Sequence, residues 1–213
     1  MDMPERKTEY RAMIRPSDEL SDLLKEQLSQ IAENVYKRKT DNVIYRVKTV
    51  KKQTNPRKLF APGDGEIIDT EISLHMALGQ KIAIDEKNEN EVLQRMEEVT
   101  SNTKSFTLIS TELGDYGEDF TIFLAFSQSD EADNLTALIK EKMELFFPSE
   151  REKRDILHFT LVYDDVDSEN IEKAWKVIDK SKLVNRGLPV ASLWLWKNKG
   201  GWKPYKEFPF KSS

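Results

Sequence analysis

Apolar residues recur at three- and four-residue intervals in four stretches of the chain, and this spacing predicts amphipathic helices. The first helix is expected to begin at Ser17, whose hydroxyl can cap it, with Asp18 and Glu19 in the first turn. Asp130 is the expected cap of the third helix, and Pro148 would end it. The four predicted helices cover residues 17–36, 89–99, 130–147 and a stretch that begins at about 168.

Between these stretches, β-branched and aromatic residues alternate with polar ones, which is typical of half-buried strands. Gly79 is expected to end the third strand, and turn formers between 105–110 and 119–127 predict an antiparallel hairpin. Several short connections favour antiparallel over parallel sheets, so the expected fold class is α+β. The predicted strands are 9–15, 42–50, 72–78, 105–110, 119–127, 156–163, 189–197 and 202–208.

Composition is typical of a globular protein. The 213 residues suit one large domain or two small lobes, and 38% are hydrophobic against 33% charged. No stretch approaches the ~18 uncharged apolar residues of a membrane-spanning helix, and the first eleven residues lack the apolar core of a secretory signal. We therefore expect a cytoplasmic protein, with a nuclear location as the alternative and no membrane partner. A monomer is the expected state.

The net charge of −5 is unevenly distributed along the chain. Nine Lys and Arg residues against one acid lie between Lys37 and Lys58. One interpretation is a basic rim that attracts a phosphate-bearing partner. The other is a solvated face, or an edge strand that carries lysines to prevent aggregation. We treat about 37–66 as a loop and strand insertion within a single domain, 1–213.

Cysteine is absent from the chain and histidine occurs twice. Without cysteine, disulfides, thiolate nucleophiles and cysteine-based zinc sites are excluded. Two histidines without a His-x-x-x-His or Glu-x-x-His spacing give little support to a metal site, so we expect no metal and no cofactor. The two histidines are therefore the main candidates for chemistry.

Both histidines lie in the same local pattern. Leu74-His75-Met76-Ala77-Leu78 and Leu157-His158-Phe159-Thr160-Leu161 share a leucine, a histidine, an apolar residue, a small residue and a second leucine, 83 residues apart. On a strand, alternation places each histidine on the face opposite the apolar residues. If the two strands meet, the imidazoles converge. For either histidine alone, a structural role is the competing interpretation.

A pair of imidazoles suits phosphodiester chemistry without a metal, because one ring can be a neutral base while the other is a protonated acid. A hydroxyl two residues after a histidine lies on the same strand face and can donate to a phosphate oxygen. Thr160 fits that role. Ala77 does not, so a backbone amide, a water molecule or Ser73 would have to take its place.

The paired motifs, their separation and the following helix resemble the two-histidine (2H) phosphoesterase superfamily, whose His-x-Thr/Ser-x motif occurs twice. That group includes 2′-5′ RNA ligase-like proteins and cyclic phosphodiesterases. The resemblance covers about residues 9–210, and Ala77 departs from it. It implies a bilobal fold, with two mainly antiparallel sheet-plus-helix halves related by a pseudo-twofold axis around a central cleft.

The resemblance also implies a function and a site. His75 and His158 would be the acid–base pair and Thr160 a phosphate ligand, acting on RNA-derived 2′,3′-cyclic phosphates or 2′-5′ linkages. A nucleotide or RNA terminus would be the substrate. Tyr163 stands where relatives often carry a basic residue, and it could stack on a base or line the rim. The same holds for one of the three tryptophans near the C-terminus, Trp194, Trp196 and Trp202. Ordinary core packing is the alternative for all these aromatic residues.

Two functions from other classes remain open. Ala77 could mark a catalytically weakened module that binds a nucleotide or RNA end without cleaving it. The chain could instead be a protein-interaction domain that uses the 17–36 helix or the acidic span 112–133. Retained binding without turnover would identify the first, and loss of partner binding on neutralising the acidic span would identify the second.

Overall fold

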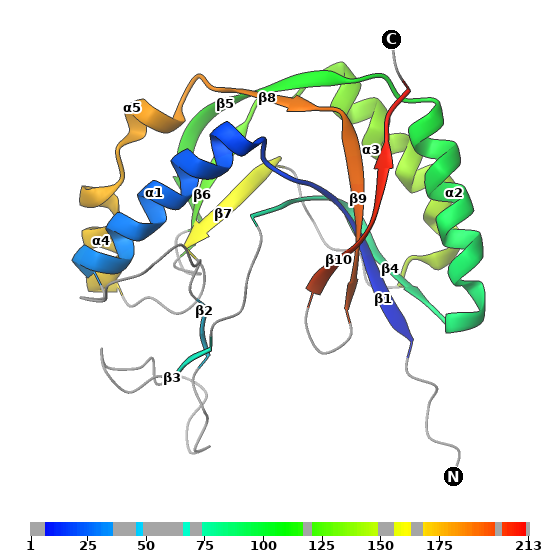
Figure 1. Ribbon diagram of the computed structural model, residues 1–213, viewed down its shortest axis with the longest axis horizontal. Coiled ribbons are helices and arrows are strands. Elements are labelled where there is room, and N and C mark those ends of the chain that lie inside the picture. Colours follow the sequence, from blue (N-terminus) through cyan, green and yellow to red (C-terminus); the bar gives the residue numbers. More distant parts are fainter. Residues whose placement is uncertain are drawn as a thin grey trace.

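The computed structural model describes residues 7–35, 46–48, 66–68, 74–116, 121–148, 156–162, 168–198 and 202–211 (Figure 1). Its strands are β1 Thr8–Ile14, β2 Arg46–Lys48, β3 Glu66–Ile68, β4 Met76–Ile84, β5 Phe106–Asp115, β6 Ile122–Phe126, β7 His158–Val162, β8 Gly187–Val190, β9 Ser192–Asn198 and β10 Trp202–Pro209. Its helices are α1 Asp18–Val35, α2 Glu89–Ser101, α3 Asp130–Met143, α4 Ser168–Val177 and α5 Lys180–Leu183, with short 3₁₀ turns at Glu86–Asn88 and Glu144–Phe146.

The strands form two four-stranded antiparallel sheets, and each sheet belongs to one lobe. The first lobe has the strand order β10-β9-β1-β4, with α2 and α3 beside it. The second has the order β7-β6-β5-β8, with α1, α4 and α5 beside it. The expected bilobal α+β fold is confirmed. The chain passes repeatedly from one lobe to the other, first after β1 and last between β8 and β9, so each lobe is built from distant segments.

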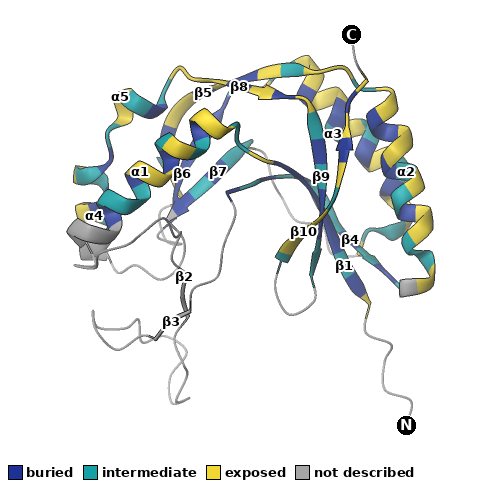
Figure 2. Ribbon diagram, viewed as in Figure 1, coloured by how far each residue is buried: buried dark blue, intermediate teal, exposed yellow. Residues whose placement is uncertain are grey.

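Figure 2 shows buried residues on the sheet and on the helices of each lobe. Their apolar side chains form the hydrophobic core. In the first lobe, Tyr10, Ala12 and Ile14 of β1 point into this core from alternate positions. In α1 of the second lobe, the buried residues Leu20, Leu24 and Ile31 follow helical spacing. Alternation along the strands and the helical period therefore place the apolar faces as the sequence predicts.

The predicted N-cap residue is correct for α1 and wrong for α3. The Ser17 hydroxyl accepts a hydrogen bond from the backbone N–H of Leu20, which confirms the predicted cap of α1. The prediction that Asp130 caps α3 is wrong, because Ser129 takes that position. Ser129 has an extended backbone and its hydroxyl accepts from the Ala132 N–H at 3.2 Å. Asp130 instead lies in the first turn, where its negative charge favours the helix dipole.

The third predicted strand does not end at Gly79. Strand β4 continues through Gly79 to Ile84, and Gly79 has a φ of 64°. Tyr10 pairs with Ile82 and Ala12 with Leu78, so the register of β1 and β4 shifts at this point. A left-handed glycine permits such a bulge, and the strand resumes beyond it.

The predicted strand over 189–197 is two strands. Strand β8 pairs with β5 in the second lobe, whereas β9 pairs with β1 in the first, and Ala191 lies between them. Most of the basic stretch at about 37–66 lies outside the described residues. Within it the structure shows β2, which pairs antiparallel with β3.

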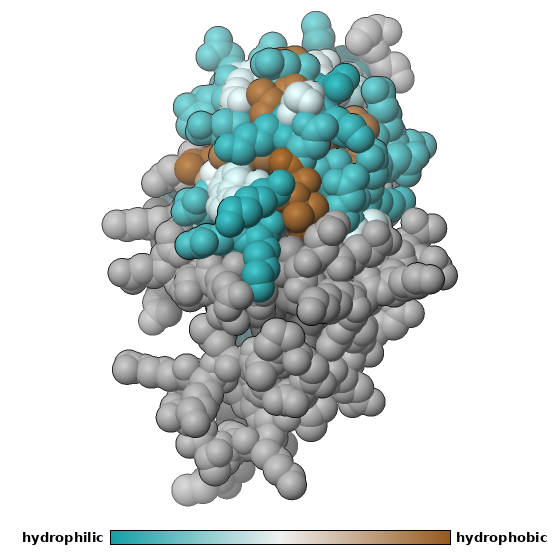
Figure 3. All heavy atoms as spheres, turned by 90° about the vertical axis from the view of Figure 1, so that its left-hand side faces the viewer, coloured by the Kyte–Doolittle hydropathy of each residue, from teal (hydrophilic) through white to brown (hydrophobic). Residues whose placement is uncertain are grey.

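The outer surface of the second lobe is mostly hydrophilic, with smaller apolar areas between the polar side chains (Figure 3). Within the described ranges, no helix combines the length and the apolar character required to cross a membrane.

Candidate active site

His75 immediately precedes β4, the edge strand of the first sheet. Leu74, Met76 and Leu78 are buried, whereas His75 and Ala77 are partly exposed. The predicted alternation is therefore present, with the imidazole on the face opposite the core. This face of β4 lies beside β1, where Met13 pairs with Ala77.

His158 begins β7, the edge strand of the second sheet. Phe159 and Leu161 are buried, whereas His158 and Thr160 are partly exposed on the other face. In the neighbouring strand β6, Ala125 pairs with His158 and Phe123 pairs with Thr160. The Thr160 hydroxyl therefore shares a strand face with the His158 imidazole, as alternation predicts.

The two histidine-bearing strands contact each other across the boundary between the lobes. Both β4 and β7 are edge strands, so each can approach the opposite lobe without another strand between them. Each histidine stands at the beginning of its strand, and each strand pairs antiparallel with one inner neighbour. The arrangement of the two motifs is equivalent in the two lobes.

A backbone carbonyl determines which nitrogen of His158 carries the proton. The Nδ1 atom lies 2.9 Å from the carbonyl oxygen of Ile156. A carbonyl oxygen can only accept, so Nδ1 is the protonated nitrogen in the neutral ring. The lone pair then belongs to Nε2, which can take up a proton as a base or donate one when the ring is charged. The Tyr116 hydroxyl lies 3.4 Å from the same Nδ1.

Aromatic packing holds His158 in place. The Phe123 ring lies 4.6 Å from the Tyr116 ring and 5.2 Å from the His158 ring, measured between centroids. Gly114, opposite Phe123 in β5, leaves room for this ring. A Cβ atom at Gly114 would lie 2.6 Å from the Phe123 Cζ atom. A glycine at this position is therefore a steric requirement of the His158 environment.

His75 has a different neighbour. The Trp196 ring of β9 lies 4.6 Å from the His75 ring, tilted by 44°, and Trp196 is 1% exposed. Its indole N–H has no hydrogen-bond partner among the residues that the structure describes. Such burial makes Trp196 a packing partner of His75 in this structure. No hydroxyl follows two residues after His75, because Ala77 stands there.

Four residues that no sequence motif combines lie on one face of the first sheet, in β1, β9 and β10 or directly after β1. The Arg11 guanidinium lies 5.6 Å from the Trp202 ring, and the Arg15 guanidinium lies 4.8 Å from the Trp194 ring. The pairing of Trp194 with Met13 and of Trp196 with Arg11 places these side chains on the face that carries Ala77. Strand register creates this combination, and no local motif signals it.

Two predicted site residues cannot be placed. Ser73 and Tyr163 lie outside the described residues.

A charged cluster on the other side of β9 ties this strand to α2. The Lys197 ammonium donates to Glu89 at 2.8 Å, and the Tyr205 hydroxyl also donates to Glu89. Burial raises the pKa of Glu89, but hydrogen bonds from Lys197, Tyr205 and Tyr10 outweigh it, so the pKa lies below its usual value. The cluster fixes the strand that presents Trp196 to His75.

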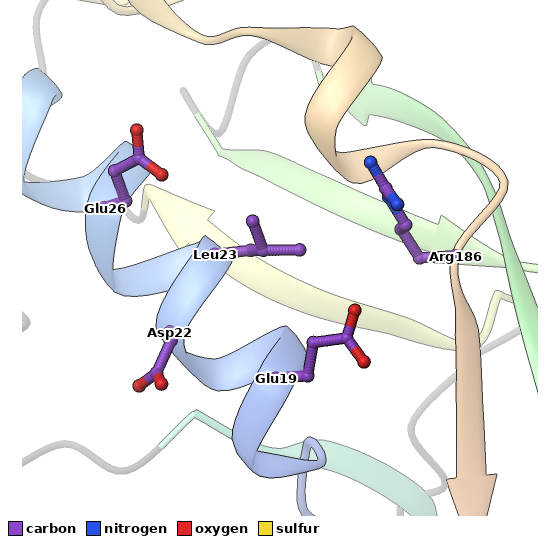
Figure 4. Close-up of a pocket in the computed structure, with 5 residues that line it drawn as sticks. All are labelled: Glu19, Asp22, Leu23, Glu26 and Arg186. Carbon is purple, nitrogen blue, oxygen red and sulfur yellow. The ribbon is translucent and has the colours of Figure 1, made fainter.

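One hollow on the surface lies away from both histidines. It has a volume of about 330 Å³ and lies between α1 and the turn before β8 (Figure 4). Its lining residues are Glu19, Asp22, Leu23, Glu26 and Arg186. Lys182 already donates to Glu26 at 2.7 Å, and the Arg186 guanidinium donates to the Lys182 carbonyl. Three carboxylates against one guanidinium disfavour a phosphate, so this hollow is not the candidate site.

Metal ligands do not gather in the part of the chain that is described. No group of three or more His, Asp or Glu side chains within those ranges could hold a metal ion.

Comparisons with known proteins give matches at the level of structure. No protein-family model and no curated protein matches the sequence. Escherichia coli LigT complexed with 3′-AMP has a TM-score of 0.61 at 12% identity, covering 97% of this chain and 100% of LigT. A protein described as a phosphoesterase has a TM-score of 0.58 at 13% identity, covering 96% and 99% of the two chains. TT0787 of Thermus thermophilus has a TM-score of 0.58 at 13% identity, covering 95% and 98%.

Similarity at these identities extends over nearly the whole of each chain, and it establishes the architecture. The protein has the fold of LigT and TT0787.

Proposed function

We propose that the protein is a metal-independent phosphodiesterase in which His75 and His158 are the acid–base pair. Its substrates would be RNA-derived nucleotides that carry a 2′,3′-cyclic phosphate or a 2′-5′ linkage. The observation that carries this proposal is the equivalent placement of the two histidines. Each stands at the start of an edge strand and faces away from the core of its lobe, and the two strands, β4 and β7, contact each other.

The reaction requires opposite protonation states of the two rings. A neutral imidazole removes a proton from water while the water oxygen attacks phosphorus. The protonated imidazole donates its proton to the ribose oxygen that leaves. The product is a phosphomonoester with a free hydroxyl, and no cofactor takes part. His158 suits either role, because the contact of its Nδ1 with the Ile156 carbonyl oxygen puts the lone pair of the neutral ring on Nε2.

Phosphate binding would rest mainly on Thr160. Its hydroxyl shares the face of His158 and can donate to a non-bridging oxygen, where negative charge develops in the transition state. Ser73 is a weaker candidate for the same task beside His75, and Tyr163 would line the rim. The basic stretch 37–58 would attract the polyanion. The LigT structure with 3′-AMP supports a ligand of nucleotide size in this fold.

The test is hydrolysis of a panel of 2′,3′-cyclic mononucleotides and 2′-5′-linked dinucleotides with a chelator present. We expect turnover by the wild type, and a loss of about 10²–10⁴-fold or more in both His75→Ala and His158→Ala, the range of general acid–base catalysis. The unfolding temperature of each variant controls for folding. Turnover that survives either substitution, or that the chelator abolishes, would overturn the proposal.

Ala77 favours a second candidate, a module that binds a nucleotide or RNA end without cleaving it. The first lobe lacks the hydroxyl that Thr160 supplies in the second. In that case the wild type would bind nucleotides without turnover, and Ala77→Thr would create activity. Turnover by the wild type in the panel above excludes this candidate.

A further inference from the structure

We propose that a groove beside His75 binds the base of the penultimate nucleotide, one position before the nucleotide that carries the scissile phosphate, so that the preferred substrate is the end of an oligonucleotide. This inference rests on the proposed function and names the substrate class of that site. The groove has a volume of about 270 Å³ and lies where the end of β1 meets β8, β9 and β10. Its lining includes Arg15, Ser17, Asp18, Pro189, Ser192, Trp194 and Glu207.

The register of the first sheet places this groove on the face that carries His75. Ile14 and Met76 form the terminal pair of β1 and β4, and Arg15 and His75 are the residues directly beyond it. On the other side of β1, Met13 pairs with Trp194, and Trp194 pairs in turn with Glu207 of β10. A substrate held at His75 therefore has the groove as its neighbour across β1.

The chemistry of the groove suits a nucleobase. The Arg15 guanidinium lies over the Trp194 ring at 4.8 Å, Arg15 is exposed and Trp194 is partly exposed. Flat aromatic rings and guanidinium groups are the surfaces on which proteins stack unpaired bases. Trp196, by contrast, is buried against His75 and offers no such surface.

Size and charge decide which part of a nucleotide the groove would take. Its volume lies just below that of ligand pockets, which are roughly 300–1,000 Å³, and fits a base rather than a longer segment. Asp18 and Glu207 outnumber Arg15 among its charged residues, which disfavours a phosphate inside it. Glu207 accepts a hydrogen bond from the Ser192 hydroxyl at 2.7 Å. The base therefore enters the groove, and the phosphates stay on the side of Arg15 and His75.

The experiment compares kcat/KM for adenosine 2′,3′-cyclic phosphate with that for a trinucleotide that ends in the same group. A third substrate is the same trinucleotide with an abasic penultimate position, which keeps every phosphate. We expect the wild type to prefer the full trinucleotide by about 5–150-fold, the range for stacking one base at ~1–3 kcal/mol. The abasic trinucleotide should lose most of that preference.

Arg15→Gln and Trp194→Leu should both reduce the ratio of trinucleotide to mononucleotide kcat/KM toward one. The matched control is Lys180→Gln, because Lys180 lies 4.8 Å over the Trp175 ring in the second lobe, far from the groove in the fold. This control should retain the wild-type ratio. Because Arg15 is exposed, Arg15→Gln tests the groove even if Trp194→Leu fails to fold.

Equal kcat/KM values of the wild type for all three substrates would refute the proposed base-binding groove. A trinucleotide-to-mononucleotide ratio that Arg15→Gln leaves unchanged would refute it as well. If no substrate is turned over, the proposed function fails, and the groove is then tested by binding. The affinity for a trinucleotide 3′-phosphate should exceed that for 3′-AMP and that for the abasic form. Equal affinities for the three would refute the inference independently of catalysis.

Discussion

In the first lobe, His75 lies against a buried indole and is followed two residues later by a methyl group. In the second lobe, His158 is held by a backbone carbonyl and by Tyr116, and Thr160 follows it. The two strands have equivalent places in their sheets, but the groups around the rings differ. The Ile156 carbonyl and the Tyr116 hydroxyl lie at the His158 ring, where the carbonyl fixes the tautomer, and the Trp196 ring lies at His75. Equivalent backbone positions therefore do not give the two imidazoles the same neighbours.

The largest expected effect is at Thr160. Thr160→Ala makes the second lobe resemble the first, and we expect kcat to fall by about 10²–10³-fold, as when an oxyanion donor is removed. The measurement is steady-state hydrolysis of a 2′,3′-cyclic nucleotide. Thr160→Ser keeps the hydroxyl and should retain most of the activity. Equal rates for wild type and Thr160→Ala would show that the two lobes do not differ in phosphate binding.

The next effect concerns Gly114. Gly114→Ala would force the Phe123 ring away from its place beside His158, because the added Cβ would lie 2.6 Å from the ring. We expect a loss of about 1–3 kcal/mol in unfolding free energy, typical of overpacking, together with reduced turnover. Gly187→Ala is the control, since its Cβ would meet Thr107 at an ordinary 3.5 Å. Equal stability of the two variants in urea unfolding would contradict this account.

Sequence reasoning found the histidine strands because alternation is a local property. Buried leucines on one face and half-exposed histidines on the other follow from a period of two residues, and the structure has them. The Ser129 cap and the bulge at Gly79 were missed for different reasons. Two adjacent residues can both cap a helix, and a glycine that ends a strand has the same local pattern as a glycine in a bulge.

The rest of the candidate site depends on contacts between distant segments. Tyr116 lies in a stretch that is rich in turn formers, and its place beside His158 follows from the β5–β6–β7 register. Arg15 and Trp194 come together because β1 and β9 pair across most of the chain. The division of the predicted strand over 189–197 between two lobes also has no local signal, because both halves carry strand-forming residues.

A smaller effect is expected at Tyr116. Tyr116→Phe keeps the ring that packs on Phe123 and removes the hydroxyl that lies 3.4 Å from His158 Nδ1. We expect turnover to fall by at most about 10-fold, because a neutral hydrogen bond contributes ~0.5–1.5 kcal/mol and the Ile156 carbonyl still holds the ring. The ring signals of the two histidines in a nuclear magnetic resonance spectrum should show His158 still protonated at Nδ1. A loss of turnover beyond about 100-fold would instead indicate that the Tyr116 hydroxyl contacts the substrate.

The smallest effect belongs to the first lobe, at Glu89. Its pKa is lowered in the folded protein, so its carboxylate stabilises the fold above the usual pKa of 4.5, and this contribution is lost as pH falls through the lowered value. Glu89→Gln should therefore be less stable than wild type at pH 7 in urea unfolding, with a smaller difference at pH 3. Glu97→Gln, which breaks an exposed pair with Lys206, should change little at either pH. If the loss of stability caused by Glu89→Gln were larger at pH 3 than at pH 7, the direction of the Glu89 pKa shift would be contradicted.

The decisive measurement for paired-histidine catalysis is the pH dependence of kcat/KM for a 2′,3′-cyclic nucleotide with a chelator present. Two histidines in opposite protonation states give a bell-shaped profile, with one limb for the base and one for the acid. We therefore expect the rate to pass through a maximum and to fall on both its acid and its alkaline side. A rate that rises or falls in one direction only would contradict paired-histidine catalysis.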